Sequence, residues 1–287
     1  MTTRACIIIA AVCGVTSAAT AQFDLGGYQY AGQFALPPAA SEASAITWNW
    51  DTGTLFALGD EGDAIVEVTT TGAVIGAMSL TGFSDTEGLT YIGAGRFVIG
   101  EERLQDVYRL TYAGGGSVDR SALPSFDLGP TVGNVGIEGF SFDPRDGSYV
   151  AVKEKTPQDA LRFTTDFAGV GSVANLFNPA ALGVLDLSDV QTLSTVEALV
   201  GAAEADNLLI YSQESALLME VSRSGALLSQ FSLAGLSTTA EGVTIDSRGV
   251  IYVCDETPVV HVLTPIPGPS SLGLLALAGL VAGRRRR

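Results

Sequence analysis

The stretch Glu87-Gly88-Leu89-Thr90-Tyr91 decides the fold, because four related stretches occur elsewhere in the chain, at intervals of 43 to 53 residues. The five copies occupy residues 44–48, 87–91, 138–142, 188–192 and 241–245. Each copy is followed by a short apolar run, and a glutamate stands two or three residues beyond that run. These glutamates are Glu61, Glu102, Glu154, Glu214 and Glu256. A unit that repeats at this interval is typical of a propeller blade.

Further apolar runs supply the remaining strands of each unit. In four copies a glycine-containing turn separates the first run from the second, so the unit begins with a β-hairpin. Third strands are expected over residues 64–68, 107–112, 217–221 and 259–263, and fourth strands over 74–80 and 227–233. The sequence therefore predicts an all-β fold, a five-bladed β-propeller of four-stranded antiparallel blades. A sandwich or solenoid of the same strands is the competing architecture.

The ring is predicted to close through the N-terminal strand. Residues 33–36 read Gln-Phe-Ala-Leu and residues 230–233 read Gln-Phe-Ser-Leu, and each run ends eight residues before the next copy begins. The segment 28–36 therefore looks like a fourth strand that has no blade before it, whereas the last copy has only three strands. We expect this segment to complete the fifth blade, since closure leaves no long exposed edge.

Composition excludes several function classes. The chain has 287 residues, 15 Lys+Arg against 31 Asp+Glu, and a net charge of −16, which argues against a nucleic-acid partner. Its single histidine, His261, excludes a multi-histidine zinc site and is expected to be structural. Cys254 is expected to be an inert core residue without a disulfide partner.

Both ends of the chain resemble targeting segments. Residues 1–21 have the layout of a secretory signal peptide, with an apolar run and Ala19-Thr20-Ala21 before Gln22. Residues 265–287 combine a proline-rich linker, an apolar stretch too short to span a bilayer and four arginines. This tail resembles the PEP-CTERM sorting signal, with Pro267-Gly268-Pro269 in place of Pro-Glu-Pro. The propeller is assigned to residues 22–264.

Geometry predicts an acidic channel mouth. The start of the first strand and the end of the second meet at the same end of a blade, so Glu87, Glu138 and Glu241 should lie beside the five strand-two glutamates. Further acids should add charge nearby, while few cations are available to neutralise them. The added acids are Glu42, Asp60, Asp85, Glu101, Asp186 and Asp255, and the cations are Arg103, Lys153 and Lys155.

Such a ring favours Ca²⁺, because this ion takes six to eight oxygen ligands in irregular geometry. The predicted metal ligands are Glu61, Glu87, Glu102, Glu138, Glu154, Glu214, Glu241 and Glu256. Two alternatives stay open. The strand-two glutamates could instead bind backbone amides of the neighbouring blade, or the acids could serve solubility alone.

The motifs resemble the SdiA-regulated (YjiK-like) domain family. The resemblance lies in residues 84–92 with Gly100-Glu101-Glu102, and in residues 136–140, 212–215 and 240–246. It implies a five-bladed propeller with a calcium ion and an active site in the channel mouth. The matching positions are Glu87, Glu138 and Glu241 with the strand-two glutamates. Ala45 and Ser188-Asp189 depart from the family pattern in blades one and four.

The function predicted from these features is an exported, monomeric, calcium-binding module of the cell envelope or extracellular matrix. It would bind a divalent cation, and a polysaccharide or small molecule at the same mouth. It would contact the membrane only transiently, through the tail. The alternative is a Ca²⁺-dependent hydrolase of esters or phosphoesters, in which a glutamate acts as the base. The third possibility is a purely structural scaffold.

Overall fold

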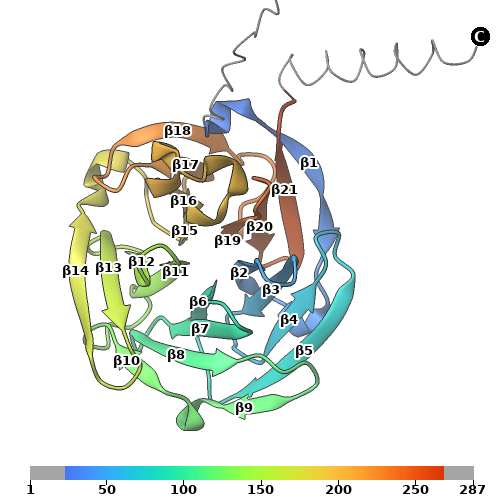
Figure 1. Cartoon of the computed structure of the whole chain (residues 1–287), viewed down its shortest axis with the longest axis vertical. Helices are drawn as coiled ribbons and strands as arrows, with labels where there is room; N and C mark the ends of the chain where they lie inside the picture. The colour runs from blue at the N-terminus through green and yellow to red at the C-terminus, as the bar shows by residue number, and fades with distance from the viewer. Residues whose placement is uncertain (1–22, 268–287) are drawn as a thin grey trace, which may run out of the picture.

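The repeated strands arrange themselves radially around one axis. The computed structural model describes residues 23–267, and its five sheets form a closed propeller (Figure 1). The predicted all-β, five-bladed architecture is confirmed. The predicted signal peptide, together with the tail from Gly268 onward, lies outside the described residues.

The innermost strand of each blade contains one copy of the repeat. Blade 1 consists of β2 (Ala43–Asn49), β3 (Thr54–Gly59), β4 (Ala64–Val68) and β5 (Val74–Thr81). Blade 2 consists of β6 (Thr86–Tyr91), β7 (Arg96–Glu101), β8 (Asp106–Thr111) and β10 (Ser125–Asp127). Blade 3 consists of β11 (Ile137–Asp143), β12 (Ser148–Lys153), β13 (Asp159–Thr165) and β14 (Gly171–Phe177). Blade 4 consists of β15 (Asp189–Thr192), β16 (Leu208–Ser212), β17 (Leu217–Val221) and β18 (Leu227–Ser232).

The fifth blade joins the two ends of the propeller. It consists of β19 (Ala240–Ile245), β20 (Ile251–Asp255), β21 (Val259–Pro265) and β1 (Tyr28–Ala35). The N-terminal strand β1 pairs antiparallel with β21 on the outside of the ring, as the sequence predicts (Figure 1). Both ends of the described chain are thus held by one sheet.

Short 3-10 helices form parts of the loops between strands. They are η1 (Leu25–Gly27), η2 (Pro38–Ala40), η3 (Arg120–Ala122), η4 (Pro179–Leu182), η5 (Leu193–Thr195), η6 (Glu197–Leu199) and η7 (Ala203–Asp206). Within residues 23–267 no helix has the length and apolar character that spanning a membrane needs.

Blade 1 departs from the expected four strands. A short strand, β9 (Ser117–Asp119), leaves blade 2 and pairs in parallel with the outer strand β5. The sheet of blade 1 therefore has five strands. Since an uncovered outer strand presents unpaired backbone groups, the crossing both covers this edge and ties two blades together.

Glycines set the close approach between blades. A Cβ at Gly88 would lie 2.1 Å from the ring of Phe140 in the next blade, and one at Gly139 would lie 2.0 Å from Oδ1 of Asp189. This explains why glycine follows glutamate in the repeat, since a larger side chain would push neighbouring inner strands apart. The apolar core occupies the spaces between these sheets.

A ring of buried side chains joins the five inner strands, two residues beyond the glycine position. The Oγ1 atom of Thr47 accepts a hydrogen bond from the backbone N–H of Tyr91 at 3.2 Å. In the same way, Oγ1 of Thr90 accepts a hydrogen bond from the backbone N–H of Phe142 at 3.0 Å. Ser141 and Thr244 accept in the same way from the next blade, and Oγ1 of Thr244 donates to Oε1 of Gln191. Every blade is thereby bonded to its neighbour around the axis.

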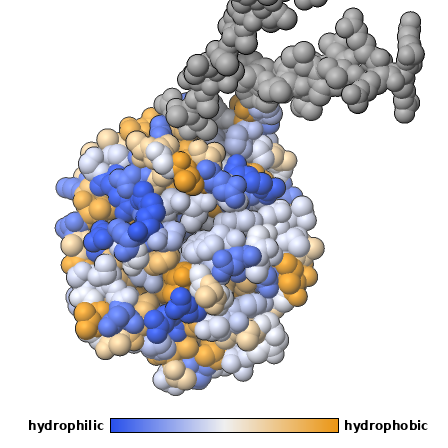
Figure 2. Space-filling model, viewed as in Figure 1, coloured by the Kyte–Doolittle hydropathy of each residue, from blue (hydrophilic) through white to orange (hydrophobic). Residues whose placement is uncertain are grey.

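The end of the ring that faces the viewer has a mixed hydrophilic and apolar surface. Figure 2 shows hydrophilic residues in several separate patches over the face in view, divided by pale and apolar surface. The face shown carries no single continuous hydrophilic band.

Candidate metal centre

A β-bulge sets the position of each strand-one glutamate. In blade 2 the pairing passes from Thr86–Glu101 to Gly88–Gly100, so Glu87 stands outside the register. Glu138 is skipped in the same way in blade 3. A bulge inserts one extra residue into a strand and re-aims its side chain. In this ring it turns the glutamate out of the ladder at the end of the inner strand.

The same irregularity recurs in two more blades. The register of β19 shifts between Ala240 and Val243, which leaves Glu241 and Gly242 unpaired with β20. In blade 1 the skipped residue is Ser44, whose hydroxyl donates to the carbonyl oxygen of Thr86 at 2.6 Å. Three blades therefore place a glutamate at the equivalent position, and the first blade places a serine.

The three bulge glutamates influence one another across the axis. Each is half-buried, and burial raises the pKa of Glu87 to about 8, with Asp85, Glu102 and Asp60 contributing in that order. Burial also raises the pKa of Glu241, and the next largest cause is Glu87. The pKa of Glu138 is raised well above its ordinary value by burial and then by Glu87. Like charges that share a desolvated site hold protons more tightly in this way.

Strand-two glutamates extend the group on two sides. Glu102, Glu138 and Glu154 bring carboxylate oxygens within 4.8 Å of one another. Glu102 is buried, and its Oε1 also accepts the N–H of Gly136 at 2.8 Å. On the other side, Glu256 adjoins Glu241 and raises its pKa.

Two buried oxygens at the mouth have no hydrogen-bond donor. They are Oδ1 of Asp60 and Oδ2 of Asp85, which belong to two of the acids that raise the pKa of Glu87. Buried carboxylate oxygens normally have partners, because an unmade hydrogen bond is costly. Among residues 23–267 these atoms are orphaned beside the bulge glutamates, and a cation is a partner that would satisfy them.

The donor set fits a hard divalent cation. It consists of carboxylates from blades 1, 2, 3 and 5, and it contains no sulfur or imidazole. Ca²⁺ prefers such oxygen ligands and accepts irregular coordination. Glu102, Glu138 and Glu154 are the residues whose carboxylate oxygens lie within 4.8 Å of one another and could hold it, and Glu87, Glu241, Asp60 and Asp85 add negative charge around them.

The eight predicted ligands do not form one group. Glu61 is exposed and lies with Glu42 and Asp60 on the blade 1 side. Glu214 is also exposed and forms an ion pair with Lys155 at 2.6 Å. Lys155 pairs with Glu154 at the same distance, so this lysine already neutralises part of the blade 4 side.

Blade 4 differs from the other blades at the mouth. Asp189 stands at the glycine position and is buried, and its carboxylate accepts the N–H groups of Val190 and Val243 at 2.7 Å. Asp186 is also buried, and it accepts from the Ser212 hydroxyl and from the N–H of Glu214. These acids connect strands and loops, so in blade 4 they have a structural role.

Two acids expected to add charge at the mouth have other partners. Glu101 is buried and pairs with Arg120, a cation that sequence reasoning missed. Asp255 accepts hydrogen bonds from Ser237, Thr239 and Thr257. Both residues stand next to a glutamate of the mouth in the chain. Because consecutive residues of a strand point to opposite faces, the pair is divided between mouth and interior.

The remaining sequence predictions concern the core. Cys254 is a buried free thiol, as expected. His261 is buried in β21 with Nε2 at 3.3 Å from Oδ2 of Asp255, which agrees with a structural role. Outside the core, Arg103, one of the cations predicted to neutralise the mouth, forms an ion pair with Asp85 at 3.0 Å.

Comparison with known proteins agrees with this fold. Myxococcus xanthus glutaminyl cyclase has a TM-score of 0.56 at 10% identity, and the match covers 83% of this chain and 95% of that chain. Virginiamycin B lyase from Staphylococcus aureus has a TM-score of 0.44 at 15% identity, covering 80% of this chain and 68% of that chain. At 10% identity the likeness to the cyclase concerns the fold alone. The SdiA-regulated family model matches residues 22–263, and the chain belongs to this family.

Proposed function

We propose that this protein is an exported calcium-binding β-propeller that acts as a binding module of the cell envelope or extracellular matrix. The observation that carries the proposal is the approach of Glu102, Glu138 and Glu154, whose carboxylate oxygens lie within 4.8 Å of one another, with Glu87 near enough to raise the pKa of Glu138. The raised pKa values of Glu87, Glu102 and Glu138 mean that the mouth by itself resists full ionisation. A bound Ca²⁺ would supply the missing positive charge and would let these groups ionise.

The ion would organise the mouth for a second ligand. Oxygen ligands at Ca²⁺ include protein carboxylates, carbonyls and water, so a bound polysaccharide or small molecule can take one of the ligand positions. Export would follow cleavage after Ala21, and processing of the tail would release the chain from transient membrane contact. Mass spectrometry of the exported protein tests both cleavages, and a secreted chain that retains residues 1–21 would contradict the export part.

Calcium titration tests the central claim. Calorimetry of the full chain at pH 7.5 should show stoichiometric Ca²⁺ uptake, and the melting temperature should rise with calcium, because an ion that binds only the native state stabilises it. Glu138→Gln should weaken binding by about tenfold or more, since it removes a charged ligand. Glu197→Gln, at an exposed position in η6, is the matched control and should bind as the wild type does. Absence of uptake by the wild type would refute the proposal.

A Ca²⁺-dependent hydrolase is the second candidate. The observation that favours it is Glu87, because its pKa of about 8 makes it able to accept or release a proton near neutral pH. A screen of generic ester and phosphoester substrates with and without chelator separates the two functions. Chelator-sensitive turnover that Glu138→Gln abolishes would favour the enzyme, whereas calcium binding without turnover would favour the binding module.

A further inference from the structure

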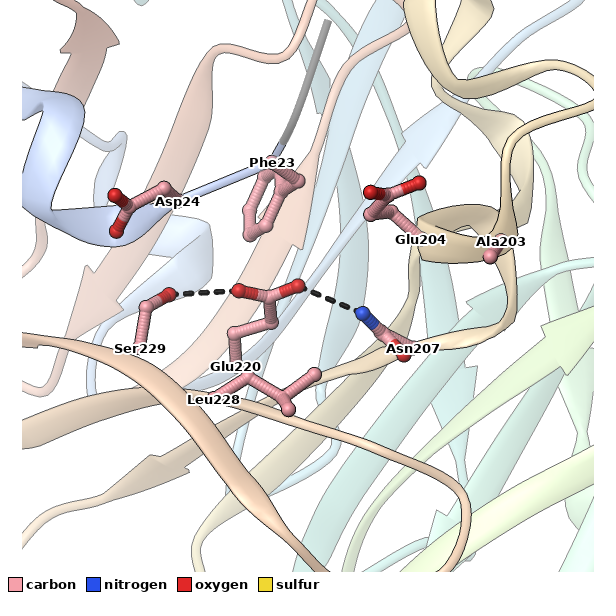
Figure 3. Close-up of a pocket in the computed structure, with 8 residues that line it drawn as sticks. All are labelled: Phe23, Asp24, Ala203, Glu204, Asn207, Glu220, Leu228 and Ser229. Atoms are coloured by element: carbon pink, nitrogen blue, oxygen red, sulfur yellow. Dashed lines mark hydrogen bonds between the residues drawn. The ribbon is translucent and has the colours of Figure 1, made fainter. Parts of the chain in front are cut away.

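A second acidic cavity lies away from the channel mouth. It has a volume of about 380 Å³ and is formed by the segment before η1, by η7 and by strands β17 and β18 (Figure 3). Glu220 pairs with Leu209, near the start of β16, while Ser212 at the other end of β16 leads to the mouth. The cavity is therefore on the opposite side of blade 4 from the mouth glutamates.

Three carboxylates line this cavity. Figure 3 shows Asp24 and Glu204 on either side of Phe23, with Glu220 below them. Glu220 is 2% exposed, and its two oxygens accept hydrogen bonds from Ser229 and Asn207 at 2.7 Å. Both donors are neutral. Within the described chain none of the side chains that line the cavity is a lysine or arginine, so these charges have no cation beside them.

The electrostatics of Glu220 agree with an open cation position. Its pKa is raised, first by burial and then by Asp24 and Glu204, while Ser229 and Asn207 oppose the shift. The cavity also has apolar walls, because Phe23 and Leu228 line it. The cavity therefore combines negative charge with apolar surface, and it is open to solvent on one side.

We propose that this cavity binds a primary ammonium group carried on a short apolar body. The ammonium would sit against Glu220 and Glu204, where charged hydrogen bonds are stronger than neutral ones. The apolar body would pack against Phe23 and Leu228. A hydrated metal ion would not use the apolar wall in this way.

Two sources could supply this ammonium. Cleavage after Ala21, as predicted for export, creates a new α-ammonium on Gln22, the residue that directly precedes Phe23 in the chain. The cavity would then receive the processed N-terminus of the protein itself. The other source is a free amine from the surroundings. The two sources share the primary ammonium, whereas the short apolar body belongs to the free amine.

The test compares the unprocessed full chain with the processed chain. Calorimetry with n-butylammonium should show binding to the unprocessed chain, whereas n-butanol, which lacks the charge, should not bind. Glu220→Gln and Glu204→Gln should each weaken amine binding by about fivefold or more, because each removes one charge from the site. Glu197→Gln is the matched control, and Glu204→Gln guards against misfolding because Glu204 is less buried than Glu220.

The processed chain identifies the source. If its own terminus occupies the cavity, n-butylammonium binding is lost and returns after acetylation of the α-amino group. If the processed chain binds the amine as the unprocessed chain does, the ligand is a free amine. The experiment is run in chelator, so its outcome is independent of the calcium proposal. Failure of the unprocessed chain to bind the amine, or equal weakening by Glu197→Gln, would overturn the inference.

Discussion

The two ends of the inner strands use acidic residues in opposite ways. At the mouth Glu138 faces other carboxylates, and its pKa is raised. At the far end of the same strand, β11, Asp143 accepts from Arg145 at 2.6 Å and from Arg223 at 2.5 Å, and the arginines hold its pKa below the usual value despite burial. Asp246 at the far end of β19 is likewise buried and pairs with Arg248 at 2.6 Å.

This difference separates acids that the protein neutralises itself from acids that it leaves next to one another. Asp143 and Asp246 also accept backbone N–H groups of the hairpin turns that follow them, so their charges are satisfied within the protein. Among the mouth glutamates, Glu102 accepts the N–H of Gly136 and Glu241 accepts from the side chain of Gln213, whereas Glu87 and Glu138 accept no backbone N–H group within the described chain. The mouth is therefore the end of the channel where electrostatic compensation is incomplete.

The largest expected effect is a pH dependence of the calcium-free protein. The mouth glutamates have raised pKa values in the folded state, so between about pH 4.5 and pH 8 the folded chain binds more protons than the unfolded chain. The free energy of unfolding should therefore decrease as pH rises through this window, by about 3 kcal/mol, and saturating calcium should reduce the decrease. Urea unfolding at pH 5 and pH 8.5, with chelator or with calcium, measures both. Stability that rises with pH in chelator would contradict the mouth electrostatics.

Removing the far-end charge should destabilise the protein at all these pH values. Asp143→Asn takes away the acceptor of two guanidinium groups, and the free energy of unfolding should decrease by about 2 kcal/mol. Calcium affinity should stay unchanged, because Asp143 lies at the other end of β11 from Glu138. Chemical denaturation and calorimetry check the two parts, with Glu197→Gln as the charge-matched control. An unaltered stability would show that the arginine pairs are dispensable.

The same type of substitution at the mouth should have the opposite sign. Glu87→Gln removes a desolvated charge, so in chelator at pH 8.5 the free energy of unfolding should increase by about 1 kcal/mol. At pH 5, where Glu87 is protonated in the fold, the variant and the wild type should be alike. Thermal unfolding in chelator at the two pH values measures this difference. A loss of stability at pH 8.5 would assign Glu87 a structural role like that of Asp143.

Sequence reasoning was most successful where the signal is periodic. The copies at residues 44–48, 87–91, 138–142, 188–192 and 241–245 became the inner strands, and the segment from Tyr28 closed the ring. Repetition reports the blade count because each unit buries its apolar faces only against its neighbours. The crossing of β9 to blade 1 carries no such signal, since it depends on which outer edge is nearest in space.

The candidate site was predictable in its residue types and less so in its grouping. The bulge that re-aims Glu87 and Glu138 is a register shift between two strands. It cannot be predicted from any single residue of the sequence. The ring that includes Thr47, Thr90 and Ser141 could have been noticed in the sequence, because a hydroxyl residue stands at the same position in four copies of the repeat. The role of that hydroxyl depends on the next blade, which supplies the N–H group that it accepts. The pairing of Asp143 with Arg223 joins residues 80 positions apart.

By itself the sequence determined a five-fold repeat, its circular closure and the presence of acids at equivalent positions, because these follow from local patterns that every blade must satisfy. Only the tertiary structure decided which acids face one another and which face an arginine or a backbone amide. The physical reason is that charge compensation depends on distances between blades. Two neighbours in the chain, such as Glu101 and Glu102, can therefore have opposite electrostatic surroundings.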